Sequence, residues 1–365
     1  MNNNILMNGL PTRYVLDGES GSGGFSDVFY CNDTHLERKV AIKTIRDADQ
    51  ARRLDDEIEA LLKIRSKHVV QVFDVIRVSD INTNMDTVGI VLEYINGEDL
   101  VESKYHLQSN TSLLKVLWQI ASGISDIHDT GLIHRDIKPN NMKLDRESIV
   151  KIFDFGLSRK SGLDAVTFGF KGTQGFAAPE QYTDEEVNFT SAIDIYAFGI
   201  SALYLATQDI PKPLLEMPPK AVPINSFDCP YLDPYPTLKV LFEKCLAHDP
   251  IDRPSIVEIT NEISKYLLFN KHQAIVVMDG KTNLLNSSTR SAKLNYGTIG
   301  SFEIEYNGLD FLLKNVVGEV FVNNELAKSG RNIPGACVIG LGNKQRHHLE
   351  RKFVTFDISN PEVTL

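Results

Sequence analysis

Apolar and polar residues alternate in short runs through the first quarter of the chain, as they do in half-buried strands. Strands are predicted at residues 14–16, 28–30, 40–42, 69–78 and 89–94. Residues 47–65 place Leu54, Ile58 and Leu61 on one helical face, which predicts an amphipathic helix. The polar residues 79–87 predict a turn.

From residue 113 onward, apolar residues recur at spacings of three and four, which is the helical period. Helices are predicted at residues 113–128, 191–207, 237–247 and 255–268. Eight prolines fall between Pro211 and Pro236, so this stretch is expected to be largely loop.

After Lys271 the pattern returns to short β-branched and aromatic runs separated by Gly and Asn. Strands are predicted at residues 274–278, 302–306, 311–313, 320–322, 338–341 and 353–358. The change near Asn270 predicts a domain boundary with a small all-β, sandwich-like domain behind it. The 365 residues are therefore expected to form an α+β chain of two domains.

Charge and cysteine content restrict the class of protein. The formal net charge is −10, which argues against nucleic acid as a partner because duplex binding depends on a basic surface. Four cysteines lie far apart without a CxxC pair, which argues against a zinc or redox motif and fits a reducing compartment. No apolar run reaches the roughly 18 residues of a membrane span, and a cytoplasmic location is expected.

Two elements of the first domain have the composition of phosphate-binding groups. Residues 21–28 (GSGGFSDV) lie between two predicted strands, and their small side chains let backbone N–H groups approach phosphate oxygens. A flexible hairpin turn explains this stretch equally well. Lys43 ends an apolar strand, where it could hold phosphates with Glu57 as its partner. A solvated strand end and a surface charge are the alternatives.

A second segment carries the groups that phosphoryl transfer requires. Residues 134–141 (HRDIKPNN) follow a predicted helix, and the sequence DFG follows from Asp154. The reaction needs a carboxylate that orients the acceptor hydroxyl, a cation on the γ-phosphate and ligands for a divalent metal. Asp136 and Lys138 supply the first two. Asn141 and Asp154 supply the oxygen ligands that Mg²⁺ prefers.

With these motifs in this order, residues 14–268 resemble the eukaryotic-type (Hanks-type) Ser/Thr protein kinases, in a soluble form of the bacterial or phage-like kind. The resemblance implies a bilobal kinase fold followed by the β-rich domain. The implied parts are a tail over residues 1–12, an N-lobe over 13–94, a C-lobe over 95–269 and a β-rich domain over 270–365. It also implies ATP with Mg²⁺ or Mn²⁺, and protein substrates.

The resemblance assigns roles to single residues. Lys43 and Glu57 correspond to the ion pair that positions phosphate, Asp136 to the catalytic base and Lys138 to its partner on the γ-phosphate. The implied ATP-binding residues are Gly21, Gly23, Gly24, Ser26, Val28, Ala41, Lys43, Glu93, Ile95, Asp99, Asn141 and Asp154, of which the last two also bind metal.

Two positions depart from the family pattern. Ser26 replaces a glycine of the Gly-rich loop. Lys143 stands where the floor of the adenine pocket usually has a leucine. Its methylene stem could cover the base while the amine reaches water.

Arg135, before the catalytic aspartate, usually goes with phosphorylation of the activation loop in this family. The predicted site is Thr167, with Ser161 second. Thr173 is expected instead to contact Asp136 and Lys138.

Glu180, in the sequence APE, is expected to pair with Arg253.

The last domain weakly resembles forkhead-associated (FHA) domains, which are β-sandwiches that bind phosphothreonine. Residues 311–324 and 333–342 carry the resemblance. Val317 and Asn324 replace the family's asparagine and glycine, and only Thr289-Arg290 is similar to its phosphate site. The domain is therefore expected to dock on the kinase domain or on a partner protein through its shape, with phosphothreonine binding as the alternative.

The predicted function is transfer of the γ-phosphate of ATP to Ser/Thr hydroxyls of proteins, with autophosphorylation in a transient homodimer. The alternative is a nucleotide-binding switch without catalysis, whose C-terminal domain recruits a partner. Asp136, Asn141 and Asp154 are all present, which favours the enzyme.

Overall fold

The computed structural model describes residues 10–22, 26–45, 51–80, 85–101, 109–160, 166–167, 172–182, 187–359 and 361. The chain divides into two compact units, residues 1–260 and 261–365. Helix α5 (Ile256–Leu268) crosses this division, and the predicted change from helix to strand near Asn270 comes after it. The predicted lobe bounds stay predictions. In the described ranges, no helix is both long and apolar enough to cross a membrane.

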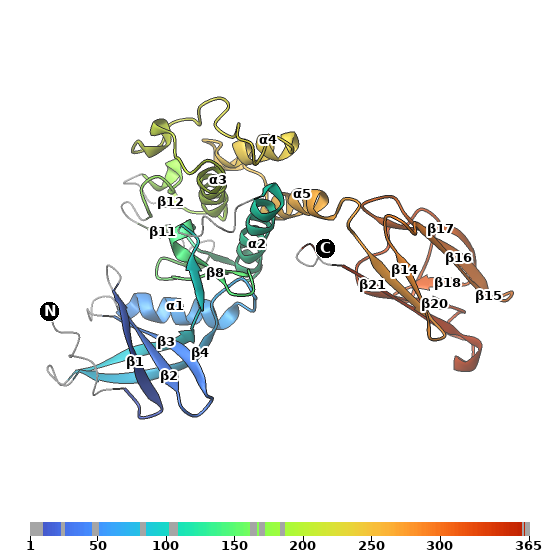
Figure 1. Ribbon diagram of the computed structural model, residues 1–365, viewed down its shortest axis with the longest axis horizontal. Helices are drawn as coiled ribbons and strands as arrows, with labels where there is room; N and C mark the ends of the chain where they lie inside the picture. The colour runs from blue at the N-terminus through green and yellow to red at the C-terminus, as the bar shows by residue number, and fades with distance from the viewer. Residues whose placement is uncertain are drawn as a thin grey trace. The chain divides into compact units, whose positions relative to one another are not determined.

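The first unit begins with an antiparallel five-stranded sheet in the order β1-β2-β3-β5-β4 (Figure 1). Its strands are β1 (Tyr14–Ser22), β2 (Ser26–Asp33), β3 (Arg38–Ile45), β4 (Val72–Asp80) and β5 (Met85–Glu93). Helix α1 (Ala51–Lys63) lies against β4 and β5. In the central strand β3, Val40, Ala41 and Ile42 are all buried, which explains their unbroken apolar run.

The predicted turn over residues 79–87 is wrong at both ends. Antiparallel pairing continues through Ser79 opposite Asp86 and Asp80 opposite Met85. Backbone hydrogen bonds extend this hairpin beyond its apolar residues, so the side-chain pattern alone ended both strands too early.

The rest of the first unit is mainly helical, with α2 (Asn110–Asp129), α3 (Ala192–Thr207) and α4 (Pro236–Cys245). A capping box at Ser109 and Ser112 begins α2. Helix α3 is buried along almost its whole length and lies against α2 and α4. The short strands are β6 (Gly97–Asp99), β7 (Leu132–Ile133), β8 (Met142–Asp145), β9 (Val150–Ile152), β10 (Arg159–Lys160), β11 (Val166–Thr167) and β12 (Val187–Asn188). Of these, β6, β8 and β9 form one sheet in that order.

The second unit is built from two antiparallel sheets, as the all-β prediction requires (Figure 1). One has the order β14-β13-β21-β20-β18-β19 and the other the order β15-β16-β17. The strands are β13 (Ala274–Met278), β14 (Lys281–Leu285), β15 (Ser291–Tyr296), β16 (Gly300–Tyr306), β17 (Phe311–Gly318), β18 (Val320–Val322), β19 (Glu325–Leu326), β20 (Cys337–Leu341) and β21 (Lys352–Ile358). Buried side chains of both sheets, including Ile304, Phe311, Ile339 and Phe356, form one core. The FHA-like character of this unit stays a prediction.

Candidate active site

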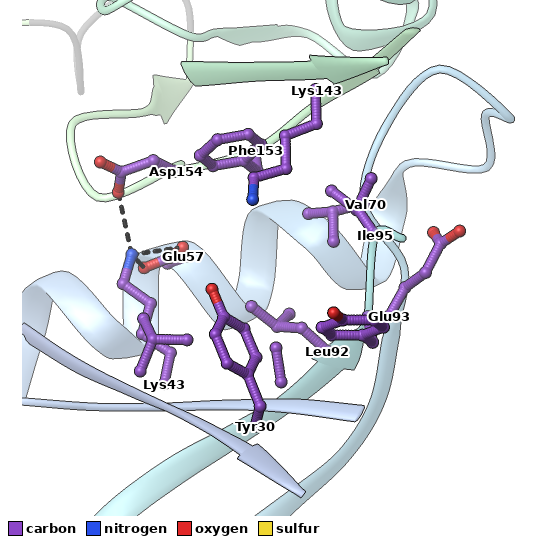
Figure 2. Close-up of a pocket in the computed structure, with 13 residues that line it drawn as sticks. Tyr30, Lys43, Glu57, Val70, Leu92, Glu93, Ile95, Lys143, Phe153 and Asp154 are labelled. Atoms are coloured by element: carbon purple, nitrogen blue, oxygen red, sulfur yellow. Dashed lines mark hydrogen bonds and ion pairs between the residues drawn. The ribbon is translucent and has the colours of Figure 1, made fainter. Parts of the chain in front are cut away.

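A pocket of about 230 Å³ in the first unit gathers residues that are far apart in the sequence (Figure 2). Most of its lining side chains are apolar, as is usual in sites that bind small molecules. The lining residues are Val28, Tyr30, Ala41, Lys43, Glu57, Val70, Leu92, Glu93, Tyr94, Ile95, Lys143, Phe153 and Asp154. They come mainly from the five-stranded sheet, from β8 and from the segment after β9.

Lys43 has two carboxylate partners at one end of this pocket (Figure 2). Its Nζ lies 2.8 and 2.7 Å from the two carboxylate oxygens of Glu57 and 2.9 Å from Oδ1 of Asp154. Burial disfavours the ammonium, but the charges of Glu57 and Asp154 outweigh burial and raise the pKa of Lys43. Lys43 is therefore a fixed cation in position to bind an anion.

Asp154 joins this end of the pocket to the segment after β9. Its backbone has a φ of +67°, a left-handed conformation that costs free energy in a non-glycine residue and is frequent at functional sites. Burial works against its ionised form, but the charge of Lys43 prevails and lowers the pKa of the carboxyl group. The backbone N–H of Phe155 donates to Oε1 of Glu57 over 3.3 Å, which ties this segment to α1.

Asn141 and Asp154 together offer oxygen ligands for a divalent metal. Nδ2 of Asn141 donates to the backbone oxygen of Asp136 over 2.8 Å and to Oδ2 of Asp136 over 2.9 Å. The amide oxygen of Asn141 makes neither of these hydrogen bonds, so it is the atom that can bind a metal ion. Within the described ranges, no cluster of three or more His, Cys, Asp or Glu side chains could hold a metal. One amide and one carboxylate fit an ion such as Mg²⁺, which completes its shell with nucleotide oxygens and water.

Besides Asn141, two further side chains hold the carboxylate of Asp136. Oγ1 of Thr173 donates to Oδ1 of Asp136 over 2.7 Å, and Nζ of Lys138 lies 2.7 Å from Oδ2. Lys138 also donates to Oγ1 of Thr173 over 2.5 Å. The expected contacts of Thr173 with Asp136 and Lys138 are therefore present.

Asp194, in α3, fixes the loop that carries Asp136. The backbone N–H groups of His134 and Arg135 each donate to the carboxylate of Asp194 over 2.8 Å. Nε2 of His128, at the end of α2, lies 2.9 Å from the same carboxylate. Complete burial disfavours the charge of Asp194, but the hydrogen bond with His128 and these backbone donors lower its pKa.

Arg253 forms the ion pair with Glu180 that the sequence suggested. Its guanidinium donates to both carboxylate oxygens, over 2.6 and 2.8 Å, and the Arg253 side chain is completely buried. It also donates to the carbonyl groups of Ala192 and Ala247. This group therefore connects the segment after Thr173 to the helical part of the unit.

The structure separates some predicted site residues from the pocket. Glu93 and Ile95 line it, whereas Asp99 lies in β6 outside the lining and pairs with Lys143 over 3.4 Å. Gly21 lies in β1 and Ser26 lies in β2. Gly23, Gly24 and Ser161 fall outside the described residues.

Sequence reasoning missed three lining residues, Tyr30, Val70 and Phe153. The signal for Tyr30 was available, because it lies two positions after Val28 and so points to the same face of the strand. Val70 lies within a predicted strand and Phe153 directly before the sequence DFG, and neither has a marker of its own.

Comparison with known proteins agrees with this arrangement of residues. Residues 14–263 match the protein kinase domain family. The chain is 36% identical over 197 residues to the serine/threonine-protein kinase PknA of Corynebacterium glutamicum, covering 51% of this chain and 41% of that protein. It is 29% identical over 276 residues to a probable serine/threonine-protein kinase of Clostridium acetobutylicum (70% of this chain, 40% of the relative). It is 31% identical over 211 residues to PrkC of Bacillus subtilis (54% and 31%). The chain thus spans about two fifths or less of the length of these relatives.

Proposed function

Because the chain belongs to the protein kinase family, we propose that it transfers the γ-phosphate of ATP to Ser or Thr hydroxyls of protein substrates. The observation that carries the proposal is the assembly of two clusters in one unit. Lys43, held by Glu57 and Asp154, offers an ammonium group to phosphate, and Asp136 with Lys138 forms a carboxylate site for an acceptor hydroxyl.

In this proposal different residues bind three parts of the nucleotide: the purine, the phosphates and the ribose. The apolar walls hold the purine, and the backbone of Glu93 and Ile95 binds its edge. Lys43 binds phosphate oxygens at the other end, and Asp99 accepts a hydrogen bond from the ribose. Asn141 and Asp154 would hold a Mg²⁺ or Mn²⁺ ion, which would supply positive charge to the phosphates.

The transfer step uses Asp136 and Lys138. Asp136 orients the acceptor hydroxyl and takes its proton as the hydroxyl oxygen forms a bond to the γ-phosphorus. The bond from that phosphorus to the bridging oxygen breaks, and ADP leaves. Lys138, 2.7 Å from Asp136, offsets the negative charge that develops on the transferred group.

Autophosphorylation at Thr167, with Ser161 second, extends the proposal. Thr167 belongs to β11, which pairs with β12 at Val187. Thr173 is a poor candidate because its hydroxyl already binds Asp136 and Lys138. Transfer between two copies would require a transient homodimer.

The second unit is proposed to recruit a protein partner or to dock by its shape. The phosphothreonine alternative has less support, because Nε and Nη2 of Arg290 already donate to the carbonyl oxygen of Ser287 and to Oδ1 of Asn270. The four free cysteines, all buried, fit a reducing compartment, and the cytoplasmic location stays a prediction.

The test is transfer of radiolabelled γ-phosphate from ATP with Mg²⁺ or Mn²⁺, followed by mapping of the labelled residues. Wild type should label Ser or Thr, while Asp136→Ala and Lys43→Met should not. A wild-type protein that binds ATP and transfers no label would overturn the proposal and favour the nucleotide-switch alternative.

A further inference from the structure

The larger sheet of the second unit has a notch on its outward face at Gly340. Gly340, in β20, lies directly opposite Phe321 in β18 and directly opposite Phe353 in β21. Residues that are directly opposite in antiparallel strands point to the same face of the sheet. The neighbours of these residues along the strands, Ile339 and Val354, belong to the core, so Phe321 and Phe353 point outward. Two aromatic side chains therefore stand on the outward face with no side chain between them.

The notch is a pocket of about 330 Å³ in the surface of this sheet. Its lining residues are Phe321, Asn323, Asn324, Val338, Gly340 and Phe353. Phe353 is 50% exposed and Val338 is 44% exposed, so the notch presents apolar surface to solvent. Neighbouring strands lie about 4.8 Å apart, which separates the backbones of β18 and β21 by roughly 10 Å. That separation leaves room for one further side chain between the two phenylalanines.

The backbone does not require glycine at position 340. The φ of Gly340 lies outside the left-handed region, and β20 pairs with both neighbouring strands without a bulge. A Cβ atom there would lie 3.7 Å or more from its nearest neighbours, Nη2 of Arg351 and the ring of Phe353, which is ordinary van der Waals contact. Glycine inside a regular strand often marks the close approach of a ligand or of another chain. The missing side chain therefore serves the notch and not the fold.

Arg351 places a positive charge at the rim of the notch. Its guanidinium carbon lies 4.9 Å from the centre of the Phe353 ring, and its Nε donates to the carbonyl oxygen of Gly342. Three other cations of this unit each have a carboxylate partner: Arg331 with Glu325, Arg346 with Glu319 and Lys352 with Asp279. Among the residues that the structure describes, no carboxylate forms such a pair with Arg351. The rim of the notch therefore favours a ligand that brings a negative charge.

We propose that the notch binds a segment of a partner protein that presents an aromatic side chain next to a carboxylate. The aromatic ring lies over Gly340 between Phe321 and Phe353, because pairs of aromatic rings gain free energy beyond the area that they bury. The carboxylate accepts hydrogen bonds from the guanidinium of Arg351. The inference rests on the role proposed for the second unit, the recruitment of a protein partner, and names the surface and the chemistry of that partner.

The test selects random peptides, displayed on phage, on the immobilised full chain, and then measures dissociation constants of the enriched peptides by fluorescence anisotropy. Gly340→Val fills the notch with a side chain that suits a strand, and Arg351→Gln removes the charge at its rim. Thr282→Val is the control for the first change, because Thr282 is an exposed residue of β14 in the same sheet and does not line the notch. Arg331→Gln is the control for the second, because it removes a cation elsewhere in the same unit.

Enriched peptides should carry Phe, Tyr or Trp beside Asp or Glu. Gly340→Val should weaken their binding roughly tenfold or more, and Arg351→Gln should weaken it roughly fivefold, while both controls stay within about twofold of wild type. Enriched peptides without this pattern, or equal binding to wild type and Gly340→Val, would overturn the inference. Calorimetric unfolding shows whether Gly340→Val folds. If it does not, Arg351→Gln decides, and unchanged binding to that variant overturns the inference.

The same measurements separate this inference from the proposed recruitment. Peptides that bind wild type and Gly340→Val equally overturn the notch alone, because recruitment then uses another surface. If no peptide is enriched on wild type, both are overturned. Self-association of wild type in sedimentation that Gly340→Val abolishes would assign the notch to a second copy of the chain and overturn the partner protein. Phosphate transfer by the same samples tests the kinase activity independently, since no residue of the notch belongs to the nucleotide pocket.

Discussion

The hydroxyl of Thr173 donates a hydrogen bond to Oδ1 of Asp136 over 2.7 Å, although 37 positions separate the two residues. Lys138 contacts both of them, and Asn141 also donates to Asp136, so three side chains fix one carboxylate. The segment that ends at Glu180 is thereby attached to the loop that carries the proposed base. A substrate hydroxyl that approaches Asp136 must do so beside Thr173.

Thr173→Val removes this hydrogen bond while keeping the shape of the side chain. We expect kcat for phosphate transfer to fall roughly 10²-fold, because the carboxylate loses its fixed orientation. The dissociation constant for ATP should not change, since Thr173 does not line the nucleotide pocket. Steady-state kinetics and calorimetry check both. Thr173→Ser, which keeps the hydroxyl, should retain most of the activity, and a fully active Thr173→Val would contradict the role.

The sequence predicted the ordered motifs and the partner of Lys43 because each depends on residue type and spacing along the chain. It did not predict strands β14 and β15. Most residues of β14 are exposed, and the strand is held at the sheet edge by backbone pairing, so it has few apolar positions to detect. The pairing of Lys143 with Asp99 depends on strand register, which nothing in either segment shows.

Arg253→Ala should destabilise the first unit by about 3 kcal/mol. The change removes a completely buried cation and leaves the carboxylate of Glu180 without its partner. Urea unfolding followed by the fluorescence of Trp118, the single tryptophan of the chain, reports this unit.

Lys220→Ala is the matched control, because Lys220 forms an exposed ion pair with Glu216 in the same unit. It should change stability by less than about 1 kcal/mol. Equal effects of the two substitutions would show that burial does not set the strength of the Arg253 pair.

Asp33 makes the stability of the first unit dependent on pH. Hydrogen bonds from the guanidinium of Arg13 lower the pKa of Asp33 from its ordinary value of 3.8 to about 2. The folded state therefore gains stability from this carboxylate above pH 3.8 and loses it as the pH falls toward 2. The difference in free energy of unfolding between wild type and Asp33→Asn should be constant near neutral pH and shrink across that range. Urea titrations at a series of pH values measure it, and a constant difference down to pH 2 would rule the pair out as the cause.

Gly318→Ala should destabilise the second unit by about 3 kcal/mol or more. Gly318 has a φ of +75°, and a Cβ atom there would lie 2.4 Å from the backbone oxygen of Ile299. Gly330 is the matched control, because its φ is +90° but a Cβ atom would meet nothing within 4 Å. Gly330→Ala should therefore cost only the backbone strain, about 1 kcal/mol. Calorimetric unfolding of the full chain separates the transitions of the two units. Equal losses in both variants would mean that the positive φ alone, and not the close approach of Ile299, requires glycine at Gly318.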